Sequence, residues 1–161
     1  INRFEKHSKG LKNYTSIYEE TLDWVNFAKD LPFTKWQLIK RLECEFCPSP
    51  YHGDMTLENI IFEEERGFHF IDPVTVVYDS WVFDLAKLRQ DLVCKWFLRY
   101  DRLNLDAKLL DIKNILFEEF KFAYPRTEML LVLMLLRVYL HSPIGTPEHD
   151  FIVTEINKLW K

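Results

Sequence analysis

The chain has 161 residues, of which 48% are apolar and 16% aromatic, enough for one domain with a buried core and too much for a disordered segment. Its formal charge of -4 gives no clustered positive charge for nucleic-acid phosphates, so we expect no nucleic-acid partner. The three cysteines are an odd number, and no secretory leader is evident. We therefore expect reduced thiols and a cytoplasmic location.

The first half of the chain predicts two helices that lead into a loop. Residues 1 to 13 have no clear period and predict a linker, whereas apolar residues recur at helical intervals over residues 15 to 29. Thr34 is placed to cap a second helix that extends to Phe46. Pro48 and Pro50 then predict an extended approach to the loop that begins at Tyr51.

Two short strands follow the loop. Residues 59 to 64 and 67 to 72 predict a β-hairpin with Gly67 at its bend. Phe68 and Phe70 alternate as in a half-buried strand, with His69 on the opposite face. The acidic run at residues 63 to 65 predicts a solvated turn.

The rest of the chain predicts helices. They cover roughly residues 79 or 80 to 100, 104 to 123, 126 to 141 and 147 to 160, separated by prolines. The most apolar run, residues 129 to 136, is far shorter than the roughly 20 residues needed to cross a bilayer. We expect a buried helix there, no membrane span, and solvent exposure of His141, His149 and Asp150. The fold class is therefore α+β and mainly helical.

The loop and the hairpin carry the residues that predict chemistry. His52, Asp54 and Asn59 fit H-x-D-x-x-x-x-N, and the second predicted strand ends at Asp72. Phosphoryl transfer needs a carboxylate that accepts the proton of the attacking hydroxyl, and oxygen ligands for Mg²⁺. Asp54 suits the first role. Asn59 and Asp72 suit the second, because a hairpin returns the chain close to its start.

Three stretches, "HGDMTLENIIF", "FHFIDP" and "DSWVFDLAKL", together resemble the protein-kinase-like superfamily, in its aminoglycoside phosphotransferase and choline kinase branch. Gly53, where protein kinases have arginine, indicates the small-molecule branch. The resemblance implies that Asp54 is the catalytic base and that Asn59 and Asp72 bind magnesium. It also implies that His52 braces the loop and that Asp84 accepts hydrogen bonds from it.

The resemblance further implies a single domain over residues 1 to 161, the C-terminal lobe of a protein-kinase-like fold. Within it we expect a catalytic loop at 51 to 59, a metal-binding hairpin at 59 to 72 and a helical substrate region at 79 to 160. Only eleven residues separate Asp72 from Asp84, which leaves no room for the activation segment of a protein kinase. The expected substrate is a small hydroxylated molecule, phosphorylated from ATP or GTP.

The nucleotide-binding lobe of such a protein is missing from these residues. No G-x-G-x-x-G loop precedes Asp54, so we expect an N-terminal lobe elsewhere in a longer protein, and no activity from this fragment alone. Blander interpretations stay open. Asn59 suits a turn, Asp79 suits a helix cap, and Asp84 suits the first turn of a helix. The competing functional hypothesis is a non-catalytic binding module derived from a kinase.

Overall fold

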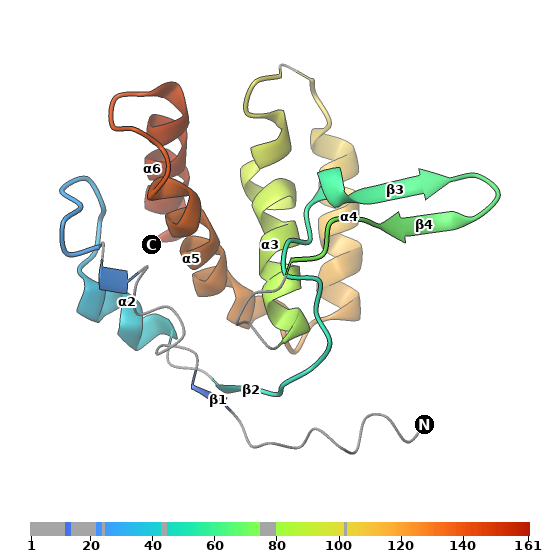
Figure 1. Ribbon diagram of the computed structural model, residues 1–161, viewed down its shortest axis with the longest axis horizontal. Coiled ribbons are helices and arrows are strands. Elements are labelled where there is room, and N and C mark those ends of the chain that lie inside the picture. The colour runs from blue at the N-terminus through green and yellow to red at the C-terminus, as the bar shows by residue number, and fades with distance from the viewer. Residues whose placement is uncertain (1–11, 14–21, 24, 43–44, 75–79, 102) are drawn as a thin grey trace.

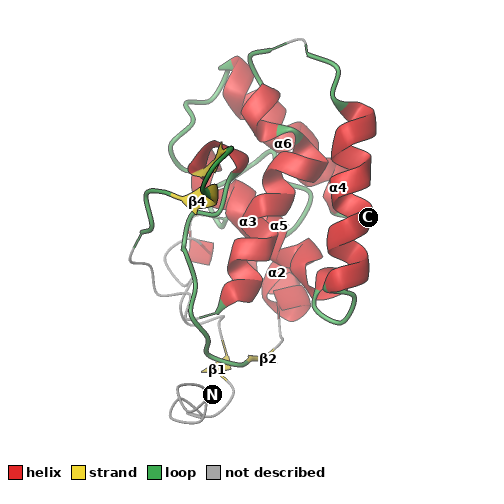
Figure 2. Cartoon of the chain, turned by 90° about the vertical axis from the view of Figure 1, so that its right-hand side faces the viewer, coloured by secondary structure: helices red, strands yellow, loops and turns green. Residues whose placement is uncertain are grey.

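The computed structural model describes residues 12–13, 22–23, 25–42, 45–74, 80–101 and 103–161. The described part is an α+β fold, mostly helical, with a two-stranded hairpin to one side (Figure 1). Helix α3 (Trp81–Cys94) packs against both α5 (Thr127–Tyr139) and α4 (Asp106–Glu119), and α6 (Pro147–Leu159) packs against α5. The strands lie beside this group of helices, as the view in Figure 2 shows.

Helix α5 forms the centre of the hydrophobic core. Its residues 130 to 136 are each at most 2% exposed, because α3, α6 and α2 (Lys35–Leu42) all pack against it. The prediction of a buried helix at this apolar run is therefore confirmed. Among the described residues, no helix combines the length and the apolar character needed to cross a bilayer.

The first predicted helices are shorter than expected. The expected linker and the first half of the helix at 15 to 29 lie almost entirely outside the described residues, and residues 25 to 27 form a turn. That helix therefore does not reach residue 29. Helix α2 ends at Leu42 and not at Phe46, since β2 (Glu45–Phe46) pairs antiparallel with β1 (Lys12–Asn13). The extended backbone required before Pro48 thus begins two residues further upstream.

The predicted hairpin is present, but it is exposed on both faces. Strands β3 (Ile60–Glu63) and β4 (Gly67–Phe70) pair antiparallel, with Phe62 opposite Phe68. The rings of this pair lie 5.1 Å apart between centroids. Phe68 and Phe70 are 68% and 58% exposed, so the prediction of a half-buried strand is wrong. No described helix covers the hairpin, which projects away from the body (Figure 1).

Helix α3 starts as predicted and ends early. The Ser80 side chain accepts a hydrogen bond from the backbone N–H of Val82 and caps the helix. The helix stops at Cys94, and Lys95 adopts a left-handed conformation with φ of 57°. A short 3₁₀ turn, η4 (Trp96–Leu98), follows. The prediction of one helix up to residue 100 is therefore wrong by six residues.

A buried histidine ties α6 to the loop before α2. The Nε2 atom of His149 lies 2.7 Å from Oδ2 of Asp30, and its Nδ1 atom lies 3.1 Å from the carbonyl oxygen of Ser142. The ring thus bridges Asp30 and Ser142 through its two nitrogens. Tyr139 donates its hydroxyl to the other oxygen of Asp30, at 2.7 Å. His149 is 3% exposed, so the prediction of a solvent-exposed residue is wrong.

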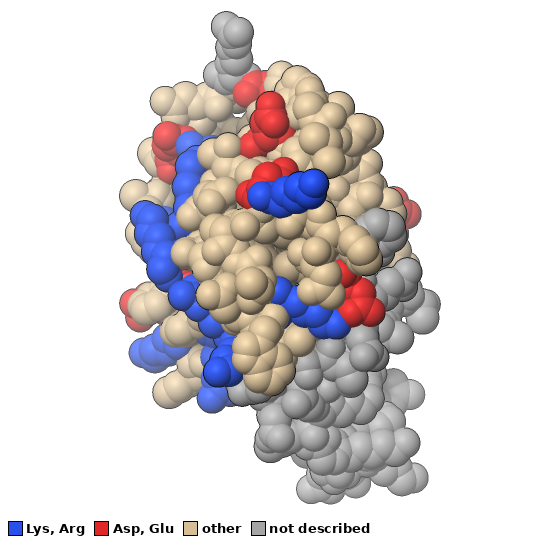
Figure 3. Space-filling view, turned by 90° about the vertical axis from the view of Figure 1, so that its left-hand side faces the viewer, with Lys and Arg blue, Asp and Glu red and all other residues tan. Residues whose placement is uncertain are grey.

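Charge is unevenly distributed over the surface. In Figure 3, Lys and Arg side chains gather along one edge of the face that includes α2 and α6. Two of the basic residues of α2, Lys40 and Arg41, lie in its last turn, where the partial negative charge of the helix terminus favours cations. The formal charge of -4 therefore coexists with a locally basic surface.

Candidate active site

A buried carboxylate of α3 anchors the loop at residues 51 to 59. Asp84 is buried and accepts a hydrogen bond from the backbone N–H of His52 at 2.6 Å, and another from that of Gly53 at 2.7 Å. The contact expected between Asp84 and the loop is thus present. Gly53 has a φ of 90°, a conformation that a side chain disfavours. Glycine and the buried carboxylate together define the turn that presents Asp54.

A second carboxylate of α3 holds the other end of the loop. Asp91 lies seven residues after Asp84, on the same face of the helix, and its Oδ2 atom accepts the backbone N–H of Leu57 at 2.7 Å. Burial raises the pKa of Asp91, and the hydrogen bond from Leu57 only partly offsets this. Sequence analysis did not identify Asp91. Two acids seven residues apart share one face of a helix, but no pattern in the sequence shows that this face meets the loop.

His52 joins the loop to the end of the hairpin. Its Nε2 atom lies 2.8 Å from the carbonyl oxygen of Ile71, and its own carbonyl accepts the backbone N–H of Val74 at 3.0 Å. The backbone N–H of Asp54 points at Nδ1 from 3.4 Å. These partners indicate that Nε2 carries the proton and Nδ1 accepts. The side chain is buried in this bracing position.

The carboxylate of Asp54, in the same loop, is partly exposed. Both of its oxygens have partners. The Nδ2 atom of Asn59 donates to the backbone oxygen of Asp54 at 2.8 Å and lies 3.3 Å from its Oδ2. The Nζ atom of Lys87, on α3, lies 3.2 Å from Oδ1. Sequence analysis also missed Lys87, which is part of the "DLAKL" stretch.

Asp72 has a strained backbone conformation, and hydrogen bonds fix the chain before and after it. Its φ is 53°, in the left-handed region that non-glycine residues rarely adopt. The preceding residue, Ile71, donates its N–H to the carbonyl of Asn59 at 3.1 Å and accepts from His52, and Val74 also bonds to His52. Strain of this kind costs of order 1–3 kcal/mol and concentrates at functional sites. Hydrogen bonds thus connect Asp54, Asn59 and the backbone beside Asp72 in one network.

The residues present suit a magnesium ion that is bound largely by phosphate. The NH₂ group of Asn59 is directed at Asp54. The side-chain carbonyl oxygen of Asn59 accepts no hydrogen bond within the described residues. The Asp72 carboxylate is exposed and likewise forms no ion pair with any of them. Magnesium is commonly held by one or two such oxygens together with water and substrate phosphates. A cage of three or more His, Cys, Asp or Glu side chains does not occur in the part of the chain that the structure describes.

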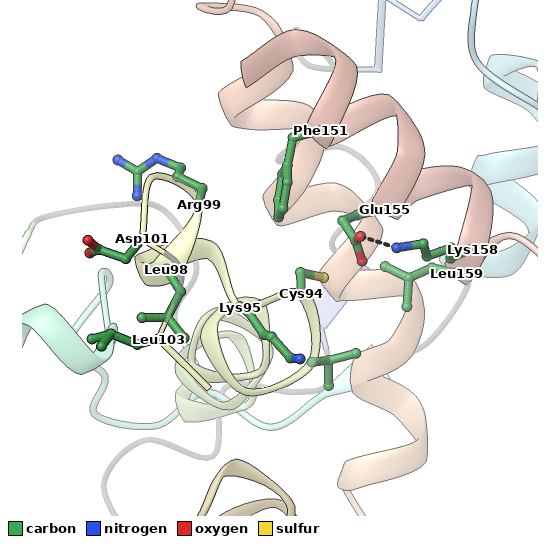
Figure 4. Close-up of a pocket in the computed structure, with 11 residues that line it drawn as sticks. Cys94, Lys95, Leu98, Arg99, Asp101, Leu103, Phe151, Glu155, Lys158 and Leu159 are labelled. Carbon is green, nitrogen blue, oxygen red and sulfur yellow. Dashed lines mark hydrogen bonds and ion pairs between the residues drawn. The ribbon is translucent and has the colours of Figure 1, made fainter. Parts of the chain in front are cut away.

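A separate hollow lies between the end of α3 and α6 (Figure 4). It has a volume of about 540 Å³, and none of its lining residues belongs to the loop or the hairpin. Its lysines are paired, Lys158 with Glu155 and Lys95 with Asp106. Burial raises the pKa of the Cys94 thiol to about 12, so it is protonated at neutral pH and a poor nucleophile. The thiol in this hollow is therefore unreactive, and both of its lysines are neutralised by acidic partners.

Comparison with known proteins gives no relative from which roles could be transferred. The chain matches no family model, no curated protein and no solved structure. The functional interpretation consequently depends on the residues and the geometry described above.

Proposed function

We propose that this chain is the catalytic C-terminal lobe of a small-molecule phosphotransferase of the protein-kinase-like superfamily, in the aminoglycoside phosphotransferase and choline kinase branch. It transfers the γ-phosphoryl group of ATP or GTP to a hydroxyl of a small substrate, with Mg²⁺. The observation that carries the proposal is the fixed carboxylate of Asp54, presented by a loop that two buried acids of α3 hold in place.

In this proposal each side chain of the site has one role. Asp54 orients the substrate hydroxyl and accepts its proton. The carbonyl oxygen of Asn59 and the carboxylate of Asp72 hold the magnesium ion. When bound, magnesium supplies positive charge that offsets the charge of the transferred phosphoryl group. Asp84 and Asp91 keep the loop in shape without touching the reacting atoms.

The role of Asp54 is tested by Asp54→Ala in the full-length protein, because the 161 residues contain no glycine-rich phosphate loop. Turnover is measured as nucleoside diphosphate release with a panel of small alcohols, sugars and aminoglycosides. We expect a fall of about 10²–10⁴-fold in kcat, with nucleotide binding unchanged. Asp111→Ala, which removes an exposed acid of α4, is the control. Equal turnover of the Asp54→Ala variant and the wild type would refute the assignment.

The role of Asp72 is tested by the binding of magnesium and nucleotide. Asp72→Ala removes a carboxylate but also changes the strained backbone, so Asp72→Asn is the better matched variant. We expect both to weaken binding of the Mg²⁺–nucleotide complex, measured by calorimetry at several magnesium concentrations. Affinities equal to that of the wild type for both variants would exclude Asp72 as a ligand.

One observation favours the second candidate, a non-catalytic binding module. Apolar side chains of α4 are exposed, with Leu110 at 49% and Ile115 at 61%, and large exposed apolar surfaces often bind other proteins. This candidate requires that the full-length wild-type protein neither bind Mg²⁺–nucleotide nor release nucleoside diphosphate. The same calorimetry and turnover assays therefore decide between the two.

A further inference from the structure

One contact that sequence analysis missed joins α3 to the proposed base. We propose that Lys87 is a positioning residue that fixes the orientation of the Asp54 carboxylate for proton transfer. This inference rests on the proposed function. It extends that function, because it assigns the orientation of the Asp54 carboxylate to a residue of helix α3, outside the loop and the hairpin.

The geometry gives each oxygen of Asp54 its own partner. The Nζ atom of Lys87 lies 3.2 Å from Oδ1, and Nδ2 of Asn59 lies 3.3 Å from Oδ2. Asn59 belongs to the same loop as Asp54, so it moves with the carboxylate. Lys87 belongs to α3 and therefore ties the carboxylate to the rigid helix. With both oxygens held, rotation of the carboxylate about the Cβ–Cγ bond is restricted.

Lys87 also occupies a helical position that suits this task. It lies three residues after Asp84 and four residues before Asp91, so all three side chains project from one face of α3. Asp84 holds the backbone at residues 52 and 53, and Asp91 holds the backbone at Leu57. Lys87 completes the set by holding the side chain between these two anchors.

The burial of Lys87 distinguishes this pair from an ordinary surface ion pair. Its side chain is only 13% exposed, and that of Asp54 is 37% exposed, whereas exposed pairs contribute little and are screened by salt. The segment from Tyr51 to Glu65 contains no Lys or Arg. Lys87 is consequently the cation that contacts Asp54 within the described residues.

The first test measures turnover of the full-length protein with the Lys87→Met variant, which keeps the length of the side chain and removes its charge. We expect kcat to fall about 10²-fold, because small errors in the position of a catalytic group have effects of this size. The KM for nucleotide stays unchanged, since Asn59 and Asp72 remain. Lys87→Arg restores the charge and recovers most of kcat. Lys108→Met, at an exposed lysine of α4 without an ion pair among the described residues, is the matched control.

The second test does not depend on turnover. The side-chain NH₂ signals of Asn59 in a ¹H–¹⁵N NMR spectrum report the carboxylate to which this group donates. We expect them to shift in Lys87→Met and to stay in place in Lys108→Met. Unmoved Asn59 signals would overturn the proposal, as would a Lys87→Met kcat within about twofold of wild type when Asp54→Ala lowers kcat by about 10²–10⁴-fold. If Asp54→Ala leaves turnover unchanged, the proposed function fails, and the NMR result still decides whether Lys87 orients Asp54.

Discussion

Asp84 holds the start of the proposed catalytic loop with both of its oxygens. Its two oxygens accept two backbone N–H groups from consecutive residues. In Asp84→Asn, one of those oxygens is replaced by an NH₂ group that faces an N–H, so one buried donor loses its partner. We expect a loss of about 1–3 kcal/mol in the free energy of unfolding, measured by urea denaturation.

The matched control for this prediction is Asp101→Asn, which makes the same change at an exposed acid. It is expected to alter the free energy of unfolding by no more than about 0.5 kcal/mol. Hydrogen exchange supplies a local measurement, because the amides of His52 and Gly53 should exchange faster in Asp84→Asn. Equal exchange in the variant and the wild type would show that Asp84 does not hold the loop.

The proximity of the candidate residues was predictable from their spacing, whereas their chemical roles stay predictions. The spacing of Asp54, Asn59 and Asp72 suffices to nominate them, because a hairpin between Asn59 and Asp72 brings the ends together. Lys87 and Asp91 were not predictable in this way. Their roles depend on which face of α3 meets the loop, and almost every side of that helix is buried, so periodicity does not single out a face.

At the scale of one element, the end of α3 is set by Lys95. Lys95 adopts φ of 57°, in a region where a Cβ atom costs about 1–2 kcal/mol. We expect Lys95→Gly to have a free energy of unfolding about 1 kcal/mol higher than Lys95→Ala. Both variants lose the ion pair with Asp106, so their difference isolates the backbone. Equal thermal midpoints for the two would contradict this account of the helix end.

The early end of α3 also shows what the pattern of apolar residues does not encode. Apolar residues continue at helical spacing through Trp96, yet the chain turns at Lys95 without a glycine or a proline. The helices that have a marked start were placed more closely. Pro147 at the first turn and Thr146 as cap define α6, and its predicted range of 147 to 160 differs from the observed one by a single residue.

At the scale of the whole molecule, Asp30 connects the loop before α2 to Tyr139 of α5 and His149 of α6. Burial raises the pKa of Asp30, but the hydrogen bonds from His149 and Tyr139 outweigh it, and the pKa lies below its usual value of 3.8. The carboxylate is therefore favoured in the folded state. Its contribution to stability is complete above pH 3.8 and is lost as the pH falls through the lowered folded pKa.

We expect Asp30→Asn to be less stable than the wild type at about pH 5, where the Asp30 carboxylate is charged, and the difference to shrink toward about pH 3. Urea unfolding at the two pH values measures this. Asp111→Asn, at an exposed acid of α4, should show no such change. A difference between Asp30→Asn and the wild type that is constant over this range would exclude the linkage. The separation of 119 residues between Asp30 and His149 explains why no local pattern predicted the pair.

The left-handed backbone at Asp72 sets stability against chemistry at one position. Glycine would adopt this φ of 53° without the penalty that any side chain incurs there, so Asp72→Gly is expected to melt at a higher temperature than Asp72→Ala. The backbone at position 72 favours glycine and the proposed magnesium ligand requires a carboxylate, so folding stability and the proposed chemistry make opposite demands on one residue.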